Sequence, residues 1–240
     1  MSNYSLLKNP PLVALAIAAT AGIGSAELLV NHDNPLIPTG LRPGDSFHLV
    51  FATSATTNRD SGGGADNYAI SHWNSFADTV AANSTVTEIQ PTLAALDWFA
   101  ILSTVSVAAR DNAVISAPVY RLDGELVATG FDDIWDGSLA FNIQLTENLT
   151  LVPGAQAELT WSGSTSAGLP HGTYPLGNGA ESALTGRASS IGGGWLAGGT
   201  HERRGPTTSL RFYALSELIT IAAPPDADDD GLPDWYEEAH

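Results

Sequence analysis

The chain has 240 residues, a formal net charge of −17 at pH 7 and no cysteine. Its only lysine is Lys8, so the rest of the chain lacks a polybasic run that could displace counterions from phosphates, which argues against nucleic acid and anionic membrane surfaces as partners. The lack of cysteine excludes disulfide bonds and thiolate metal sites, and the lack of any further lysine excludes Schiff-base catalysis by lysine in the rest of the chain.

Residues 1–26 have the organisation of a secretory signal peptide. Lys8 supplies the positive charge, residues 11–23 form an apolar stretch, and residues 24–26 (GSA) give a small-residue cleavage site before Glu27. A membrane anchor is the alternative, but this alanine-rich, glycine-interrupted stretch is shorter than the ~20 residues that a spanning helix needs. We therefore expect a secreted protein, extracellular or at the cell surface, with no transmembrane span after cleavage.

Two early segments have clear periodicity. Residues 46–53 (SFHLVFAT) alternate, with Phe47, Leu49 and Phe51 on one face, which predicts a half-buried strand. Residues 66–82 carry apolar side chains at helical intervals, which predicts an amphipathic helix that packs on a sheet. The apolar stripe of this helix consists of Ala69, Ile70, Trp73, Phe76, Ala77 and Val80.

Short strands are predicted further along the chain. Residues 98–104 form a compact apolar run, and residues 118–128 contain two strand-like runs around Asp123-Gly124, a dipeptide favoured in tight hairpin turns. Further strands are expected at 156–162 and 209–221, with an irregular Gly-, Ser- and Thr-rich loop over about 163–207 between them. Little helix accompanies these strands, so we expect one α+β domain over residues 27–222, followed by an acidic segment at 223–240.

The acidic segment carries the clearest chemistry of the chain. Its spacing is D-x-D-x-D-G-x-x-D-x-x-E, in which Gly231 allows the sharp turn of a calcium-binding loop. An acidic linker without an ion is the alternative, but it has no need of glycine and glutamate at these positions. The predicted Ca²⁺ ligands are the carboxylates of Asp226, Asp228, Asp230, Asp234 and Glu237 and the main-chain carbonyl of Leu232.

Prolines set the type of calcium motif. Pro224 and Pro225 exclude a helix entering the loop, because each lacks a backbone donor and fixes an extended path. The motif therefore resembles a thrombospondin type 3 or dockerin-like repeat more than a complete EF-hand. We expect weak binding, with a Kd of ~10⁻⁴ to 10⁻³ M, in the range of extracellular modules.

A possible catalytic set is less clear. Asp132, Asp133 and Asp136 flank Trp135 and could act as acid and base on a polysaccharide, which would make the protein an extracellular hydrolase. The alternative interpretation is structural: Phe131, Ile134 and Trp135 would be core anchors, and the aspartates would satisfy nearby backbone donors. His171 and His201 lie in loops with a hydroxyl or a glutamate nearby (Thr173, Tyr174, Glu202), but neither has a paired orienting acid that would give it a catalytic role. Arg110-Asp111 is typical of a local ion pair.

A resemblance to a known family rests on the shared order of several motifs over residues 46–221. These are W-F-A-I-L-S (98–103), A-R-D-N (109–112), A-P-V-Y-R-L-D-G-E-L-V (117–127), F-D-D-I-W-D-G-S-L (131–139), L-T-W-S-G-S (159–164), T-G-R-A-S-S-I-G-G-G-W-L-A-G (185–198) and F-Y-A-L-S-E (212–217). In this order they resemble the endostatin domain of collagens, which has a C-type lectin-like fold. The segment L-R-P-G-D-S-F-H-L-V-F-A-T-S (41–54), together with A-R-D-N and W-D-G, is also similar to bacterial secreted proteins that join such a domain to an acidic calcium-binding tail.

The resemblance implies a small twisted, mainly antiparallel sheet with a flanking helix and long loops. Departures from animal endostatin limit what it implies about function. The disulfides are absent, the arginines are scattered in an acidic protein so that heparin binding is not expected, and His32-Asp33 offers too few ligands for zinc. Calcium-dependent lectins carry E-P-N or Q-P-D and W-N-D tripeptides, which this chain lacks.

Three functional interpretations follow. The favoured one is a non-catalytic interaction module that presents the loop at about 163–207 to an extracellular protein or glycan, with no enzymatic activity and no cofactor other than Ca²⁺. The polysaccharide hydrolase using Asp132, Asp133 or Asp136 is the second. The third is a structural unit of a larger envelope protein.

Overall fold

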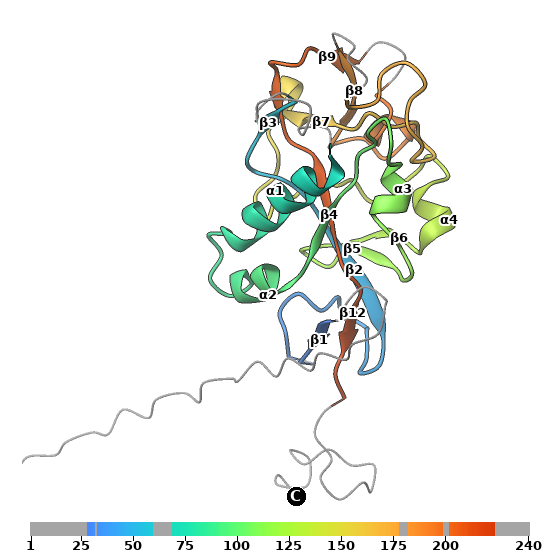
Figure 1. The fold of residues 1–240 in the computed structure, drawn as a ribbon. Helices are drawn as coiled ribbons and strands as arrows, with labels where there is room; N and C mark the ends of the chain where they lie inside the picture. The colour runs from blue at the N-terminus through green and yellow to red at the C-terminus, as the bar shows by residue number, and fades with distance from the viewer. Residues whose placement is uncertain (1–27, 32, 60–68, 178–181, 199–201, 224–240) are drawn as a thin grey trace, which may run out of the picture.

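The computed structural model describes residues 28–31, 33–59, 69–177, 182–198 and 202–223 (Figure 1). The predicted signal peptide at 1–26, His32, the start of the predicted helix at 66–68 and the calcium motif lie outside these ranges. Within them, the protein is a mixed α+β structure dominated by sheet, as the sequence predicts.

A sheet of seven strands forms the centre of the molecule. Five strands follow the order β1-β12-β2-β11-β4, β5 also pairs with β2, and β6 pairs with β5. The bounds are β1 (Leu28–Val30), β2 (Ser46–Ala52), β4 (Trp98–Ala100), β5 (Val119–Arg121), β6 (Leu126–Ala128), β11 (Tyr213–Ser216) and β12 (Ile219–Ile221). The β1/β12 and β2/β5 pairs are parallel, and the other pairs in this sheet are antiparallel.

Two smaller sheets lie at the end of the molecule away from β1 and β12 (Figure 1). One joins β3 (Thr57–Asn58) to β10 (Ser209–Leu210), and the other has the order β7-β8-β9, all antiparallel. The bounds of the latter strands are β7 (Leu159–Trp161), β8 (Ala183–Arg187) and β9 (Arg203–Arg204). The region at 163–207 was predicted as an irregular loop, but it contains the strands β8 and β9, so this prediction is wrong in part.

Strand β2 is buried on both faces. Phe47, Leu49 and Phe51 point into one hydrophobic core, whereas Val50 and Ala52 belong to a second core on the opposite face. The strand itself is confirmed, but its prediction as half-buried is wrong, because the second core covers the face that the alternation assigned to solvent.

The helix α1 (Ile70–Ala82) covers the first core, and its described part confirms the predicted amphipathic helix. Its buried side chains are Trp73, Ala77, Val80 and Ala81, and the Trp73 ring packs edge-on against Phe212 with centroids 5.4 Å apart. Two polar side chains of the same helix face β4: Asp78 Oδ1 accepts the N–H of Trp98 at 2.8 Å, and Asn74 Oδ1 accepts that of Ala100 at 2.9 Å. The helix thus buries an apolar stripe and also satisfies the edge of the sheet.

The remaining helices are short: α2 (Gln90–Ala95), α3 (Ala109–Asn112), α4 (Phe131–Ile134) and the 3-10 turns η2 (Ala155–Glu158) and η3 (Gly193–Trp195). In the second core Trp135 stacks on Trp195 with ring centroids 6.1 Å apart, and Ile134 is fully buried. Phe131 was expected to be a third anchor, but it is 42% exposed because it lies at the first position of α4. None of the helices in the described ranges combines the length and the apolarity required to cross a bilayer.

The predicted hairpin is present, whereas two of the predicted strands have other bounds. The hairpin around Asp123-Gly124 is confirmed, with β5 and β6 paired and Gly124 at a φ of +86° that favours glycine. The single strand predicted at 209–221 is instead divided into β10, β11 and β12, because the chain changes neighbours: β10 pairs with β3, and β11 with β2 and β4. Similarly, the strand predicted at 156–162 begins only at Leu159, after the turn η2.

Candidate functional site

The two small sheets and the described loops between them form a distinct region, which we call the loop end (β3, β7–β10 and the described parts of 163–207). A network of charges holds it together. Arg187 in β8 donates from Nε to both carboxylate oxygens of Glu202 at 2.9 Å, and its Nη1 donates to Glu158 in η2. Ser189 donates a further hydrogen bond to Glu158. These contacts fix η2, β8 and the segment before β9 relative to one another.

The contacts of Arg187 with Glu202 and Glu158 change the pKa of its guanidinium. The hydrogen bond to Glu202, followed by the contact with Glu158, raises the pKa of Arg187 despite some burial. Glu158 is 8% exposed, so the guanidinium of Arg187 supplies a partner to a largely buried carboxylate. The described part of the loop end is therefore held by specific side-chain contacts, whereas the sequence predicted an irregular loop.

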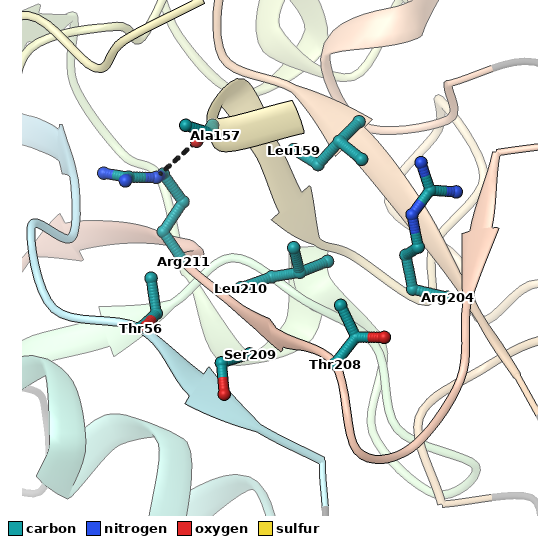
Figure 2. A pocket seen from close by; sticks show the side chains of 8 residues that line it. All are labelled: Thr56, Ala157, Leu159, Arg204, Thr208, Ser209, Leu210 and Arg211. Atoms are coloured by element: carbon teal, nitrogen blue, oxygen red, sulfur yellow. Dashed lines mark hydrogen bonds between the residues drawn. The ribbon is translucent and has the colours of Figure 1, made fainter. Parts of the chain in front are cut away.

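A cavity of about 320 Å³ opens in the loop end (Figure 2). Its floor is apolar and consists of the buried side chains of Leu159 and Leu210. Hydroxyl groups surround this floor, contributed by Thr56, Thr208 and Ser209. Figure 2 shows Arg204 and Arg211 on either side of the space. Apolar surface with a few placed hydroxyls and cations is typical of a small ligand-binding pocket.

Arg211 is part of the wall and is fixed in place. Its Nε donates to the carbonyl of Ala157 at 2.8 Å, and its Nη1 donates to the carbonyl of Thr53 at 3.0 Å. Burial lowers the pKa of Arg211, and the charge of Glu147 partly opposes this effect. Because Arg211 already binds two main-chain carbonyls, it shapes the pocket more than it offers free donors to a ligand.

A second feature of the loop end is a stack of three side chains. The ring of Tyr174 lies 5.4 Å from that of His171 with an interplanar angle of 22°, and the guanidinium of Arg203 lies 4.8 Å from the Tyr174 ring centroid. His171 Nδ1 accepts the N–H groups of Thr173 and Tyr174 at 3.2 and 3.1 Å, which assigns this histidine to a turn. His201, the other loop histidine, lies outside the described residues.

The candidate catalytic aspartates have local roles. Asp133 Oδ2 accepts the N–H and hydroxyl of Thr129 at 2.6 and 2.9 Å, and Asp136 Oδ1 accepts the corresponding groups of Ser138 at 2.7 and 2.8 Å. Asp132 is exposed on α4. These hydrogen bonds agree with the structural interpretation of the segment.

Two tryptophans that could stack on a sugar are buried. Trp135 and Trp161 are 7% and 0% exposed, so neither presents a ring face to solvent. Arg110 and Asp111 form the expected local pair, at 4.0 Å and largely exposed.

The predicted calcium ligands Asp226, Asp228, Asp230, Leu232, Asp234 and Glu237 all lie outside the described residues. Within the part of the chain that the structure describes, no group of three or more His, Asp or Glu side chains could hold a metal ion. Calcium binding therefore remains a prediction from the sequence.

Sequence reasoning missed the residues that organise the loop end. Arg187 pairs with partners 15 and 29 positions away, so no local spacing connects them. The pocket residues are likewise far apart in sequence: Leu159 begins β7, Ser209 and Leu210 form β10, and Thr56 and Thr208 immediately precede β3 and β10. Trp195 and Leu196 of the same region are fully buried, so part of this glycine-rich segment packs into the core.

Neither a scan against protein-family models nor a search of curated proteins finds a match to this chain. The function must therefore be inferred from the geometry of its own residues.

Proposed function

We propose that the protein is a secreted or surface-displayed, non-catalytic binding module. In this proposal residues 27–222 form a C-type lectin-like, endostatin-like domain that binds an extracellular protein or glycan, and residues 223–240 bind Ca²⁺ through Asp226, Asp228, Asp230, Leu232, Asp234 and Glu237. The ligand binds at the loop end.

The observation that carries this proposal is the rigid loop end with its cavity. The Arg187 network holds three elements in a fixed geometry, and the cavity beside it combines an apolar floor with hydroxyl groups. A preformed pocket on an anchored scaffold loses little conformational entropy when a ligand binds, which is the arrangement that recognition sites use.

The fold assignment is supported by where the motifs lie. W-F-A-I-L-S begins in β4, A-R-D-N forms α3, and the motif at 117–127 spans the β5–β6 hairpin. The mainly antiparallel sheet, the flanking helix α1 and the long connections between β7 and β10 agree with a C-type lectin-like architecture.

A binding screen tests the proposal. Residues 27–240 should be applied to glycan arrays and to extracellular protein panels, once with Ca²⁺ and once with chelator. A ligand of the loop end should be retained in chelator, whereas a ligand of the acidic segment should be lost.

A matched pair of variants locates the ligand. Thr208→Trp places a large ring at the wall of the cavity, and Thr207→Trp makes the same change at the exposed neighbouring position, which does not line it. We expect the first variant to lose binding by at least about tenfold and the second to retain it. Equal binding by both variants would exclude the cavity as the recognition site.

A further inference from the structure

A second cavity, of about 370 Å³, lies where β2, β4, the end of α3 with the segment after it, and the junction of β11 with β12 meet. None of its lining residues belongs to the loop end. Its chemistry is set by one buried carboxyl group, one buried imidazole and one exposed hydroxyl, from Glu217, His48 and Ser116.

Glu217 has one carboxylate oxygen in use and one available. Its side chain is 6% exposed, and Oε1 accepts the main-chain N–H of Asp97 at 3.0 Å. Within the described ranges Oε2 has no hydrogen-bond partner. Oε2 is not one of the fully buried polar atoms that lack a partner, so it is accessible at the cavity and can accept a hydrogen bond from a ligand. Burial raises the pKa of Glu217, as expected for a carboxyl group that lacks a cation.

His48 fixes the hydroxyl on the opposite wall. Its Nδ1 faces the carbonyls of Ser216 and Glu217 at 3.0 and 3.2 Å, so the proton is assigned to Nδ1. Its Nε2 accepts the main-chain N–H of Ser116 at 3.2 Å, with the Ser116 hydroxyl 3.4 Å away. The buried ring therefore holds Ser116 at the mouth of the cavity.

The rest of the lining favours a cation on an aliphatic stem. Phe99, Val114 and Leu218 contribute apolar surface, and no arginine lines the cavity. Asp97, next to Glu217, adds further negative charge. Among the lining residues only His48 and Glu217 are of the types that bind zinc, whereas a zinc site needs three or four ligands.

We propose that this cavity binds a primary ammonium group carried on an aliphatic chain. The ammonium has three donors: one pairs with Oε2 of Glu217 and another with the hydroxyl of Ser116, while the methylene chain packs against Phe99, Val114 and Leu218. Two sources carry this chemistry, a lysine side chain of another protein and a free aliphatic amine.

The proposal can be tested by calorimetry on residues 27–240 with hexylammonium chloride, and with hexan-1-ol as a neutral probe of nearly the same shape. We expect the ammonium to bind and the alcohol to bind at least about tenfold more weakly. Nuclear magnetic resonance should show a shift of the Ser116 amide on titration, which locates the probe. Comparison of Nα-acetyl-lysine methylamide with spermidine distinguishes a protein lysine from a free polyamine as the better ligand.

Variants provide the controls. Glu217→Gln keeps an oxygen for the N–H of Asp97 but removes the charge, and it should weaken hexylammonium binding by at least about tenfold. Glu125→Gln makes the same change at an exposed carboxylate on the β5–β6 hairpin and should leave binding unchanged. If Glu217→Gln does not fold, Val114→Lys is the second variant: its own ammonium would occupy the cavity from an exposed position, and the added probe should no longer bind.

Three results would overturn the proposal. The first is the absence of heat from hexylammonium at millimolar concentration, and the second is equal affinity for hexan-1-ol. The third is unchanged ammonium binding in Glu217→Gln or, where that variant does not fold, in Val114→Lys.

Discussion

Arg187 and Glu202 form a bidentate pair, with Nε of the guanidinium 2.9 Å from each carboxylate oxygen. The same guanidinium reaches Glu158, so one side chain joins the strand β8 to two other segments of the loop end. Its position explains why a region rich in glycine and serine has a defined structure.

Replacement of Arg187 with alanine should destabilise the loop end. The change leaves Glu158 and Glu202 without their cation, and we expect a loss of about 1–3 kcal/mol in the free energy of unfolding. Amide hydrogen exchange should accelerate in β8 and β9 and remain slow in β2 and β11. Arg110→Ala is the matched control, because its pair with Asp111 is exposed and 4.0 Å long. Equal acceleration throughout the central sheet would contradict a local role for Arg187.

The stability of the protein should increase with pH because of His48. Burial is the main cause that lowers the pKa of this ring below its usual 6.5, so below that pH the unfolded chain binds a proton that the folded chain resists. The free energy of unfolding should therefore fall as the pH is lowered from 6.5 towards the folded pKa. Urea unfolding at several pH values between 5 and 7.5 measures this slope, and His48→Gln should remove the contribution of the imidazole to it.

Glu217 acts in the opposite direction and has to be separated. Its folded pKa is raised above the usual 4.5, so its contribution to stability is complete below that value and declines as the pH rises through the folded pKa. The pH slope of stability should be measured in Glu217→Gln and in the Glu217→Gln/His48→Gln double variant. The difference between these two slopes is the contribution of the imidazole. A slope that persists in the double variant would assign the pH dependence to other groups.

Calcium binding should depend on particular positions of the acidic segment. Asp226→Ala or Glu237→Ala removes a predicted ligand and should abolish Ca²⁺ uptake at millimolar concentration, as measured by calorimetry. Asp229→Ala removes the same charge at a position that is not a predicted ligand and should retain binding. The melting temperature of the domain should stay the same in all three variants. A melting transition that collapses together with metal binding would contradict the separation between domain and tail.

Asp78 should contribute measurably to stability through its hydrogen bond to the N–H of Trp98. Asp78→Ala leaves that N–H unsatisfied in a partly buried position, and we expect a loss of about 1–3 kcal/mol in denaturant unfolding. Asp132→Ala, at an exposed aspartate of α4, should change stability by no more than about 0.5 kcal/mol. Equal stability of the two variants would show that the hydrogen bond from Trp98 to Asp78 makes no net contribution to the free energy of unfolding.

Local patterns predicted part of this fold correctly. The alternation in 46–53, the helical spacing in 66–82 and the Asp123-Gly124 turn each depend on neighbours in sequence, and β2, α1 and the β5–β6 hairpin occur there. The α+β class follows from these elements. Local patterns do not predict that the second face of β2 is buried. The residues that cover it come from segments far away in the sequence.

The candidate sites were less accessible to sequence reasoning. β8 and β9 lie in a region whose sequence does not alternate between apolar and polar residues. They form because β8 pairs with β7 and β9, and because Arg187 binds two carboxylates from other segments. Glu217 and Ser116 are about a hundred positions apart, and both line one cavity only because β11 and β5 flank β2. Such convergence depends on strand order, which the spacing of residues does not encode.

The edge strand β4 is closed by side chains. Asp78 and Asn74 of α1 accept its two outward N–H groups, and Asn112 of α3 donates to the carbonyl of Ala100 at 2.9 Å. A strand from a second molecule would have to displace these three bonds before it could extend the sheet. Copies of the protein can therefore be brought to high concentration while this edge resists fusion into a continuous sheet, without any disulfide to enforce their separation.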